Sequence, residues 1–256
     1  MSKKKVVKKR IKRGLICASA ATVVSLAAVA ELGRRYEWGP FFYLNFKKRE
    51  REIVKKYSAR KRRGEIIFYG ASNFCRWEEM EQDMLPYTVQ NHGFGGSTDA
   101  ELIRSAGRLL YPYAPAIVVL QTGSNDCARL PGPKRTLYER VLNRKIRMLE
   151  TFRRELPDTI FIVISGILMP GRRQYDNIIK RINRSVQGIA SQTDRIYYVD
   201  AEDMTVGKNG KHRKDLFIED GVHLTHEARI LWAEKYIKPA LDKVISDHPE
   251  LAYLKR

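Results

Sequence analysis

Apolar residues in this chain fall into short, nearly continuous runs that alternate with longer stretches of mixed character. Runs that are rich in β-branched and aromatic residues predict strands, and five such runs occur after residue 64. Continuous apolar runs are typical of parallel strands that are buried on both faces. The strands are predicted at Glu65–Tyr69, Thr88–Asn91, Ala116–Gln121, Thr159–Ser165 and Arg195–Val199.

The stretches between these runs have the spacing of amphipathic helices. Strands that alternate with helices predict an α/β fold, a three-layer α/β/α sandwich around a five-stranded parallel sheet. Residues 64–256 are predicted to form one domain, because this part of the sequence has no internal repeat and no change in composition that would indicate a second domain. The helices are predicted at Arg76–Met84, Asp99–Leu110, Thr136–Glu155, Arg173–Ser191 and Thr225–Ile245.

The N-terminal segment differs from the rest of the chain. Eight lysines or arginines lie among residues 1–13, and an uncharged stretch of 17 residues follows from Gly14 to Ala30. This order predicts a transmembrane anchor over residues 14–31, or a signal peptide that is cleaved after Ala30. The anchor is favoured, because the apolar core is long for a signal peptide and a basic stem follows it. Both alternatives export the domain, since the denser positive charge precedes the apolar stretch and keeps the N-terminus in the cytoplasm.

Residues 32–63 are predicted to form a stem between the anchor and the domain. Aromatic residues concentrate over Tyr36–Phe46, and positive charge concentrates over Lys47–Arg63. Within the basic part, Ile53, Val54 and Tyr57 recur at helical spacing. The segment is therefore predicted to be a basic surface helix with an anionic lipid or polymer as its partner, or equally a solvated linker without one.

The net charge of +19 suggests a nucleic-acid partner until its distribution is considered. Residues 1–63 contain 20 Lys or Arg against 4 Asp or Glu, whereas residues 64–256 contain 28 against 25. An enzyme that acts on nucleic acid needs basic surface on its folded domain, so we expect no nucleic-acid partner.

Three cysteines provide no disulfide framework, because Cys17 lies in the apolar stretch. Cys75 and Cys127 remain, each a few residues after a candidate site residue and on loops predicted to be neighbours. In an exported domain they form either a disulfide or two small buried thiols, and the sequence leaves both alternatives open.

Three short polar runs carry the candidate chemistry: Gly70–Ser72, Gly123–Asp126 and Asp220–His223. The first two follow predicted strands, and the carboxyl ends of strands are where an open α/β sheet binds ligands. Together the runs supply a hydroxyl nucleophile, a histidine base and a carboxylate that can orient the base. Taken singly, each residue has a structural explanation as a helix cap, a turn former or a core histidine. Their order along the chain favours a site.

With Trp77 and the run Asn91–Gly96, these three runs resemble the four sequence blocks of the SGNH (GDSL-type) hydrolases over residues 65 to about 240. The resemblance implies a flavodoxin-like sheet of strand order 2-1-3-4-5. It also implies ester hydrolysis without a metal or an organic cofactor. One departure is Ala71, which stands where the family often has Asp, a residue outside the catalytic triad.

The resemblance also implies a role for each matching residue. Ser72 corresponds to the nucleophile, His223 to the base and Asp220 to the acid that orients it. The oxyanion hole corresponds to the backbone N–H groups of Ser72 and Gly96 and the side-chain amide of Asn125. We therefore expect a membrane-tethered, extracytoplasmic serine esterase or deacylase that acts on an acylated glycan, a lipid or a small ester. The alternatives are an O-acyltransferase with the same site and a non-catalytic protein that binds an envelope glycan.

Overall fold

The computed structural model describes residues 40–58 and 64–255. The described residues from Arg49 onward form one compact domain, and those before Arg49 belong to a separate unit. The predicted basic segment 1–13 and the predicted anchor or signal peptide 14–31 lie outside the described residues. Within the described part of the chain, no helix combines the length and the apolar character needed to cross a bilayer.

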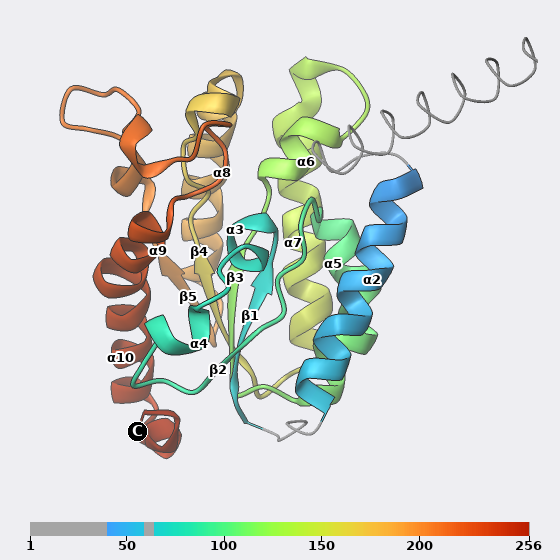
Figure 1. Ribbon diagram of the computed structural model, residues 1–256, viewed down its shortest axis with the longest axis vertical. Helices are drawn as coiled ribbons and strands as arrows, with labels where there is room; N and C mark the ends of the chain where they lie inside the picture. Colours follow the sequence, from blue (N-terminus) through green and yellow to red (C-terminus); the bar gives the residue numbers. More distant parts are fainter. Residues whose placement is uncertain (1–39, 59–63, 256) are drawn as a thin grey trace, which may run out of the picture. The chain divides into compact units, whose positions relative to one another are not determined.

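Five parallel strands form the central sheet in the order β2-β1-β3-β4-β5 (Figure 1). In register, Ile66 of β1 pairs with Ile117 of β3, which in turn pairs with Ile160 of β4. The predicted strand order is confirmed, and the observed strands lie within the predicted ones or differ by one residue. The strands are β1 (Ile66–Gly70), β2 (Val89–Asn91), β3 (Ile117–Gln121), β4 (Ile160–Ile164) and β5 (Ile196–Val199).

Alternate residues of the strands pack against two different helix layers. On one face, the Phe68 ring contacts Trp77, whose indole stacks on that of Trp232 from the C-terminal helices. On the other face, the Tyr69 ring contacts Phe152, and its hydroxyl donates to the carbonyl oxygen of Leu102 at 2.7 Å. The helices are α2 (Pro40–Tyr57), α3 (Ser72–Cys75), α4 (Met80–Asp83), α5 (Asp99–Leu109), α6 (Ser124–Arg129), α7 (Leu137–Glu155), α8 (Asp176–Ala190), α9 (His226–Trp232) and α10 (Lys238–Asp247).

The helix predicted at Arg76–Met84 is wrong in extent, because only the single turn α4 forms within it, and the separate turn α3 ends just before it. Trp77 explains the break. Its side chain is fully buried, and its indole N–H donates to Asp83 Oδ2 at 2.7 Å. The chain must leave the helical path to bring this ring into the core.

The C-terminal part of α2 belongs to the compact unit that begins at Arg49, whereas the sequence predicts a domain that begins at Gly64. Ile53 and Tyr57 are each 1% exposed. The Tyr57 hydroxyl accepts from the Asn91 backbone N–H at 3.0 Å and donates to Glu81 at 2.8 Å. This part of the predicted stem is therefore helical, and Ile53 and Tyr57 pack in the domain core.

Cys75 and Cys127 do not form a disulfide in this structure. Cys127 is 3% exposed, and burial raises the pKa of its thiol to about 12. The sequence left open a disulfide or two thiols, and in this structure both cysteines are free thiols.

Candidate active site

Ser72 is the first residue of α3, immediately beyond the carboxyl end of β1. This position leaves its side chain at the sheet edge, although the residue is only 7% exposed. The next residue, Asn73, accepts through Oδ1 from the backbone N–H of Leu224 at 3.2 Å. That hydrogen bond joins the turn after β1 to the loop that carries His223, 151 residues later in the chain.

A continuous chain of hydrogen bonds links Asp220, His223 and Ser72. Asp220 Oδ2 lies 2.6 Å from His223 Nδ1, and His223 Nε2 lies 2.9 Å from Ser72 Oγ. The second carboxylate oxygen, Asp220 Oδ1, accepts from the backbone N–H groups of Val222 and His223 at 2.8 and 2.9 Å. The carboxylate is therefore held by three donors, and it can fix the tautomer in which Nδ1 carries the proton.

The pKa values of this pair suit a neutral base beside a charged acid. Burial alone raises the pKa of Asp220, but the His223 ring N–H and two backbone N–H groups outweigh it and lower the pKa. Burial lowers the pKa of His223, and the positive charges of Arg76 and Arg172 act in the same direction against the stabilising hydrogen bond to Asp220. His223 is therefore neutral at pH 7 and able to accept the proton of Ser72.

The Asn125 side chain lies at the start of α6, beyond the carboxyl end of β3. Its Nδ2 donates to the carbonyl oxygen of Ser97 at 3.0 Å, and its Oδ1 accepts from Arg172 at 2.8 Å. Since an amide nitrogen has two hydrogens, one N–H of Asn125 remains for a substrate oxygen. Gly96 precedes Ser97 on the same loop and has a φ of +69°, a conformation that favours glycine.

Arg172 is a site residue that the sequence reasoning missed. It lies in the 3₁₀ segment Pro170–Tyr175 after β4, and its Nη1 also donates to Ser124 Oγ at 2.5 Å. The preceding Gly171 donates its backbone N–H to Gly221 at 2.9 Å, so the same segment reaches the loop of Asp220. A Cβ at Gly171 would lie 2.5 Å from the carbonyl oxygen of Asp220, which explains why glycine occupies this position. No sequence motif marks this arginine.

A buried charged cluster lies next to Asn125. Asp126 and Asp99 are both fully buried, and Asp126 Oδ2 accepts from the backbone N–H of Asp99 at 3.0 Å. Lys145, only 4% exposed, contacts Asp99 Oδ1 at 3.0 Å. Burial and the nearby Asp99 raise the pKa of Asp126 to about 7. The cluster ties the starts of α5 and α6 together and so supports the loop that holds Asn125, a role beyond that of an ordinary turn former.

Side chains at metal-binding spacing occur within the described residues at Glu79, Asp83 and His226, whose ligand atoms lie within 4.8 Å of one another. His226 and Glu79 are largely exposed, and Asp83 already accepts from the Trp77 indole. None of these three side chains hydrogen-bonds to Ser72, His223 or Asp220 in the described part of the chain.

Comparisons with known proteins identify the family of the chain. The model of the GDSL-like lipase/acylhydrolase family matches residues 57–228. The chain belongs to this family. The resemblance predicted from the four sequence blocks is therefore confirmed, and the family is one of carboxylic ester hydrolases. No curated protein matches the chain in sequence.

Solved structures of the same fold include a GDSL-like lipase from Bacteroides thetaiotaomicron, with 22% identity and a TM-score of 0.58 over 76% of this chain and 98% of that one. The catalytic domain of the peptidoglycan O-acetyltransferase A from Streptococcus pneumoniae has 17% identity and a TM-score of 0.53, over 71% of this chain and 94% of that one. A carbohydrate esterase of family 3 from Talaromyces cellulolyticus has 19% identity and a TM-score of 0.52, over 72% and 99%. At these identities the likeness establishes the α/β fold.

Proposed function

We propose that this chain is a serine esterase or deacylase in which Ser72 is the nucleophile, His223 the general base and Asp220 the residue that orients the base. The proposal depends chiefly on the hydrogen-bond chain from Asp220 Oδ2 through the His223 ring to Ser72 Oγ. Membership of the GDSL-like family supplies the reaction class, and the chain of contacts supplies the residues.

In the proposed reaction, Ser72 Oγ attacks the ester carbonyl carbon while His223 Nε2 takes the hydroxyl proton. The tetrahedral oxyanion then accepts from the backbone N–H groups of Ser72 and Gly96 and from the remaining N–H of Asn125. One such donor typically contributes ~3 kcal/mol of transition-state stabilisation. The imidazolium passes its proton to the alcohol oxygen as the C–O bond breaks, which leaves an acyl group on Ser72.

Water completes the cycle in the second half of the reaction. His223 Nε2 removes a proton from water as the water oxygen attacks the acyl carbonyl carbon. The second tetrahedral oxyanion uses the same three donors. When it collapses, the acid leaves and Ser72 Oγ recovers its proton from His223.

Hydrolysis of a chromogenic ester by the purified full chain tests this assignment. We expect wild-type protein to hydrolyse p-nitrophenyl acetate, and Ser72→Ala to lose this activity because it removes the hydroxyl that forms the acyl-enzyme. Ser191→Ala is the matched control, since it removes one hydroxyl from an exposed position at the end of α8. Equal rates for wild type and Ser72→Ala would refute the assignment.

We further propose that the domain acts outside the cytoplasmic membrane, tethered by residues 14–31 or released by cleavage after Ala30. The support is the order of charge and apolar residues before the stem. The esters of the cell envelope, on a glycan or a lipid, are then within reach. Protease treatment of intact cells should degrade the domain, whereas a domain protected until lysis would contradict this location.

An O-acyltransferase is a second candidate, because an alcohol can replace water in the deacylation step. The peptidoglycan O-acetyltransferase domain with the same fold gives this alternative its support. Adding an acceptor sugar to the hydrolysis assay and measuring acylated sugar against free acid separates the two outcomes. A non-catalytic glycan-binding role would instead leave Ser72 unreactive towards a fluorophosphonate.

A further inference from the structure

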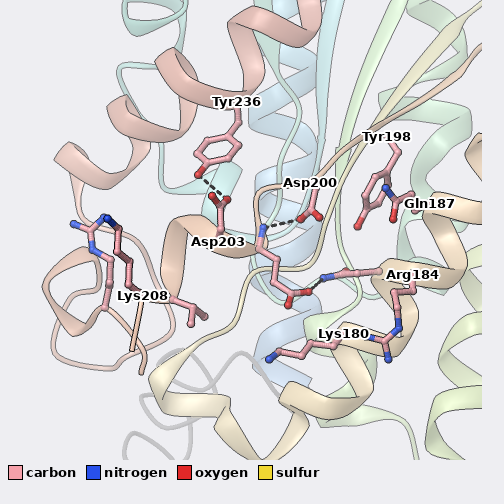
Figure 2. A pocket seen from close by; sticks show the side chains of 13 residues that line it. Lys180, Arg184, Gln187, Tyr198, Asp200, Asp203, Lys208 and Tyr236 are labelled. Atoms are coloured by element: carbon pink, nitrogen blue, oxygen red, sulfur yellow. Dashed lines mark hydrogen bonds between the residues drawn. The ribbon is translucent and has the colours of Figure 1, made fainter. Parts of the chain in front are cut away.

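A cavity of about 920 Å³ opens between α8 and the segments that follow β5 (Figure 2). Its wall is fixed to the sheet through Asn183 of α8. The Asn183 side chain accepts from the backbone N–H of Gly166 at 2.8 Å and donates to the Gly166 carbonyl oxygen at 2.9 Å, directly after β4. Asn183 Nδ2 also donates to Glu202 Oε2 at 2.8 Å, shortly after β5. The cavity therefore begins at the carboxyl edge of the sheet, the edge that also carries Ser72.

One wall of the cavity is rich in oxygen atoms. Figure 2 shows Asp203 held by the Tyr236 hydroxyl, with Asp200 nearby and Tyr198 on the side towards α8. The Tyr236 hydroxyl donates to Asp203 Oδ1 at 2.8 Å, and Asp200 Oδ1 accepts from the Glu202 backbone N–H at 3.0 Å. A carboxylate accepts about four hydrogen bonds, so both groups retain acceptor capacity. Such a wall suits a ligand that donates through several hydroxyl groups.

The rim of the cavity is basic on both sides. Lys180 and Arg184 lie one turn apart on α8, and Lys208 lies on the loop opposite them (Figure 2). Within the described part of the chain, no carboxylate forms an ion pair with any of these three side chains. Lys180 lies four residues after Asp176 on α8, and its charge acts to lower the pKa of that carboxyl, which favours the helix. Arg184 carries a like charge four residues after Lys180, so helix stability does not explain Arg184. These cations can instead contact carboxylate or phosphate substituents of a ligand.

The distance along the sheet edge sets the size of that ligand. Three strand spacings separate β1, which precedes Ser72, from β5, which precedes the cavity wall. At 4.7–4.9 Å for each spacing, the separation is roughly 14 Å. A small ester bound at Ser72 does not reach across this distance, whereas an oligosaccharide of several rings does.

We propose that the cavity is a distal binding site for an acidic glycan chain whose ester group is held at Ser72. The oxygen-rich wall accepts from the sugar hydroxyls, and Lys180, Arg184 and Lys208 contact its anionic substituents. This inference deepens the proposed esterase function and rests on it, because it names the alcohol part of the substrate.

A chain-length series tests the proposal with full-length protein. The substrates are O-acetylated oligogalacturonides of increasing length, with p-nitrophenyl acetate as the short reference ester. We expect kcat/KM to rise with length, mainly through KM, and we expect Lys180→Ala/Arg184→Ala to lower kcat/KM for the longest substrate about tenfold. Hydrolysis of p-nitrophenyl acetate by this variant should equal that of wild type.

A matched control separates the cavity from the general attraction of a basic chain for an anionic polymer. Arg147→Ala/Arg154→Ala removes the same charge from exposed positions on α7 that do not line the cavity. This control should keep the wild-type dependence on length. An equal loss in both double variants, or a dependence on length that survives Lys180→Ala/Arg184→Ala, would overturn the proposal. An equal kcat/KM for neutral O-acetylated xylo-oligosaccharides of the same length would overturn the claim that the glycan is acidic.

Failure of the esterase assignment can be distinguished from failure of the cavity assignment. Calorimetry with a non-acetylated hexagalacturonide measures binding without any reaction at Ser72. Binding that Lys180→Ala/Arg184→Ala weakens, in a protein that does not hydrolyse p-nitrophenyl acetate, would support the cavity and refute the esterase. Hydrolysis of p-nitrophenyl acetate by a protein that does not bind the hexagalacturonide would support the esterase and refute the cavity assignment.

Discussion

Arg172 offers the sharpest test of how the site is held together. Its Nη1 bridges Ser124 Oγ at 2.5 Å and Asn125 Oδ1 at 2.8 Å. We predict that Arg172→Met lowers kcat by roughly 10–100-fold with a smaller change in KM. The upper limit corresponds to losing the Asn125 donor altogether, which costs ~3 kcal/mol of transition-state stabilisation. The loss is expected to be smaller if the hydrogen bond from Asn125 to Ser97 alone still orients the amide.

The same substitution has a predicted effect on pH dependence. The charge of Arg172 contributes to the lowered pKa of His223, along with burial and Arg76. Removing that charge raises the pKa of His223, so the base becomes protonated at a higher pH. The acid limb of the kcat/KM profile should therefore move to higher pH in Arg172→Met, because that profile reports the free enzyme.

Arg172→Lys is the informative companion variant. Lysine keeps a positive charge but lacks the planar fork of guanidinium, so we expect it to retain the acid limb while recovering only part of kcat. Steady-state hydrolysis of p-nitrophenyl acetate between pH 4 and 9 measures both quantities. Wild-type kcat and an unmoved acid limb in Arg172→Met would refute the role given to this residue.

Three further predictions concern the surroundings of the site. Gly171→Ala should lower the free energy of unfolding by ~1–3 kcal/mol, measured by urea denaturation, because the new Cβ meets the Asp220 carbonyl oxygen. The same variant should also hydrolyse p-nitrophenyl acetate more slowly, because the clash displaces the loop of Asp220. Tyr57→Phe should destabilise the domain by ~1–3 kcal/mol in the same assay, since it leaves the Asn91 N–H buried without its acceptor. Asp126, whose pKa of about 7 exceeds its unfolded value, should make the free energy of unfolding fall as pH rises from about 4 to about 7 and level off above that. Asp126→Asn should flatten that fall, and an unchanged slope would contradict the raised pKa.

The sequence was sufficient for the strands but not for every helix. Runs such as Ile117–Leu120 are apolar throughout, as is typical of strands in the middle of a parallel sheet. The order of the strands in the sheet was predicted from the resemblance to the SGNH hydrolases, and not from the strands themselves. The break between α3 and α4 depends on where the Trp77 ring finds space, against Trp232 of α9, and no local pattern records that contact.

The candidate site divides in the same way. Ser72, His223 and Asp220 lie in short motifs with a fixed order, so a single sequence was enough to predict them as site residues. Arg172 has no motif, because its role arises from a loop after β4 that meets α6 in space. Likewise, Tyr57 stands in a strongly basic segment, and only the fold reveals that it packs against His92.

The most direct test of the central claim is the site of reaction with a fluorophosphonate, located by mass spectrometry of the digested full chain. The account predicts a single adduct on Ser72, which Ser72→Ala abolishes and His223→Gln slows, because Oγ is nucleophilic only when His223 Nε2 takes its proton. No adduct on Ser72, or labelling that proceeds at the wild-type rate in His223→Gln, would contradict it.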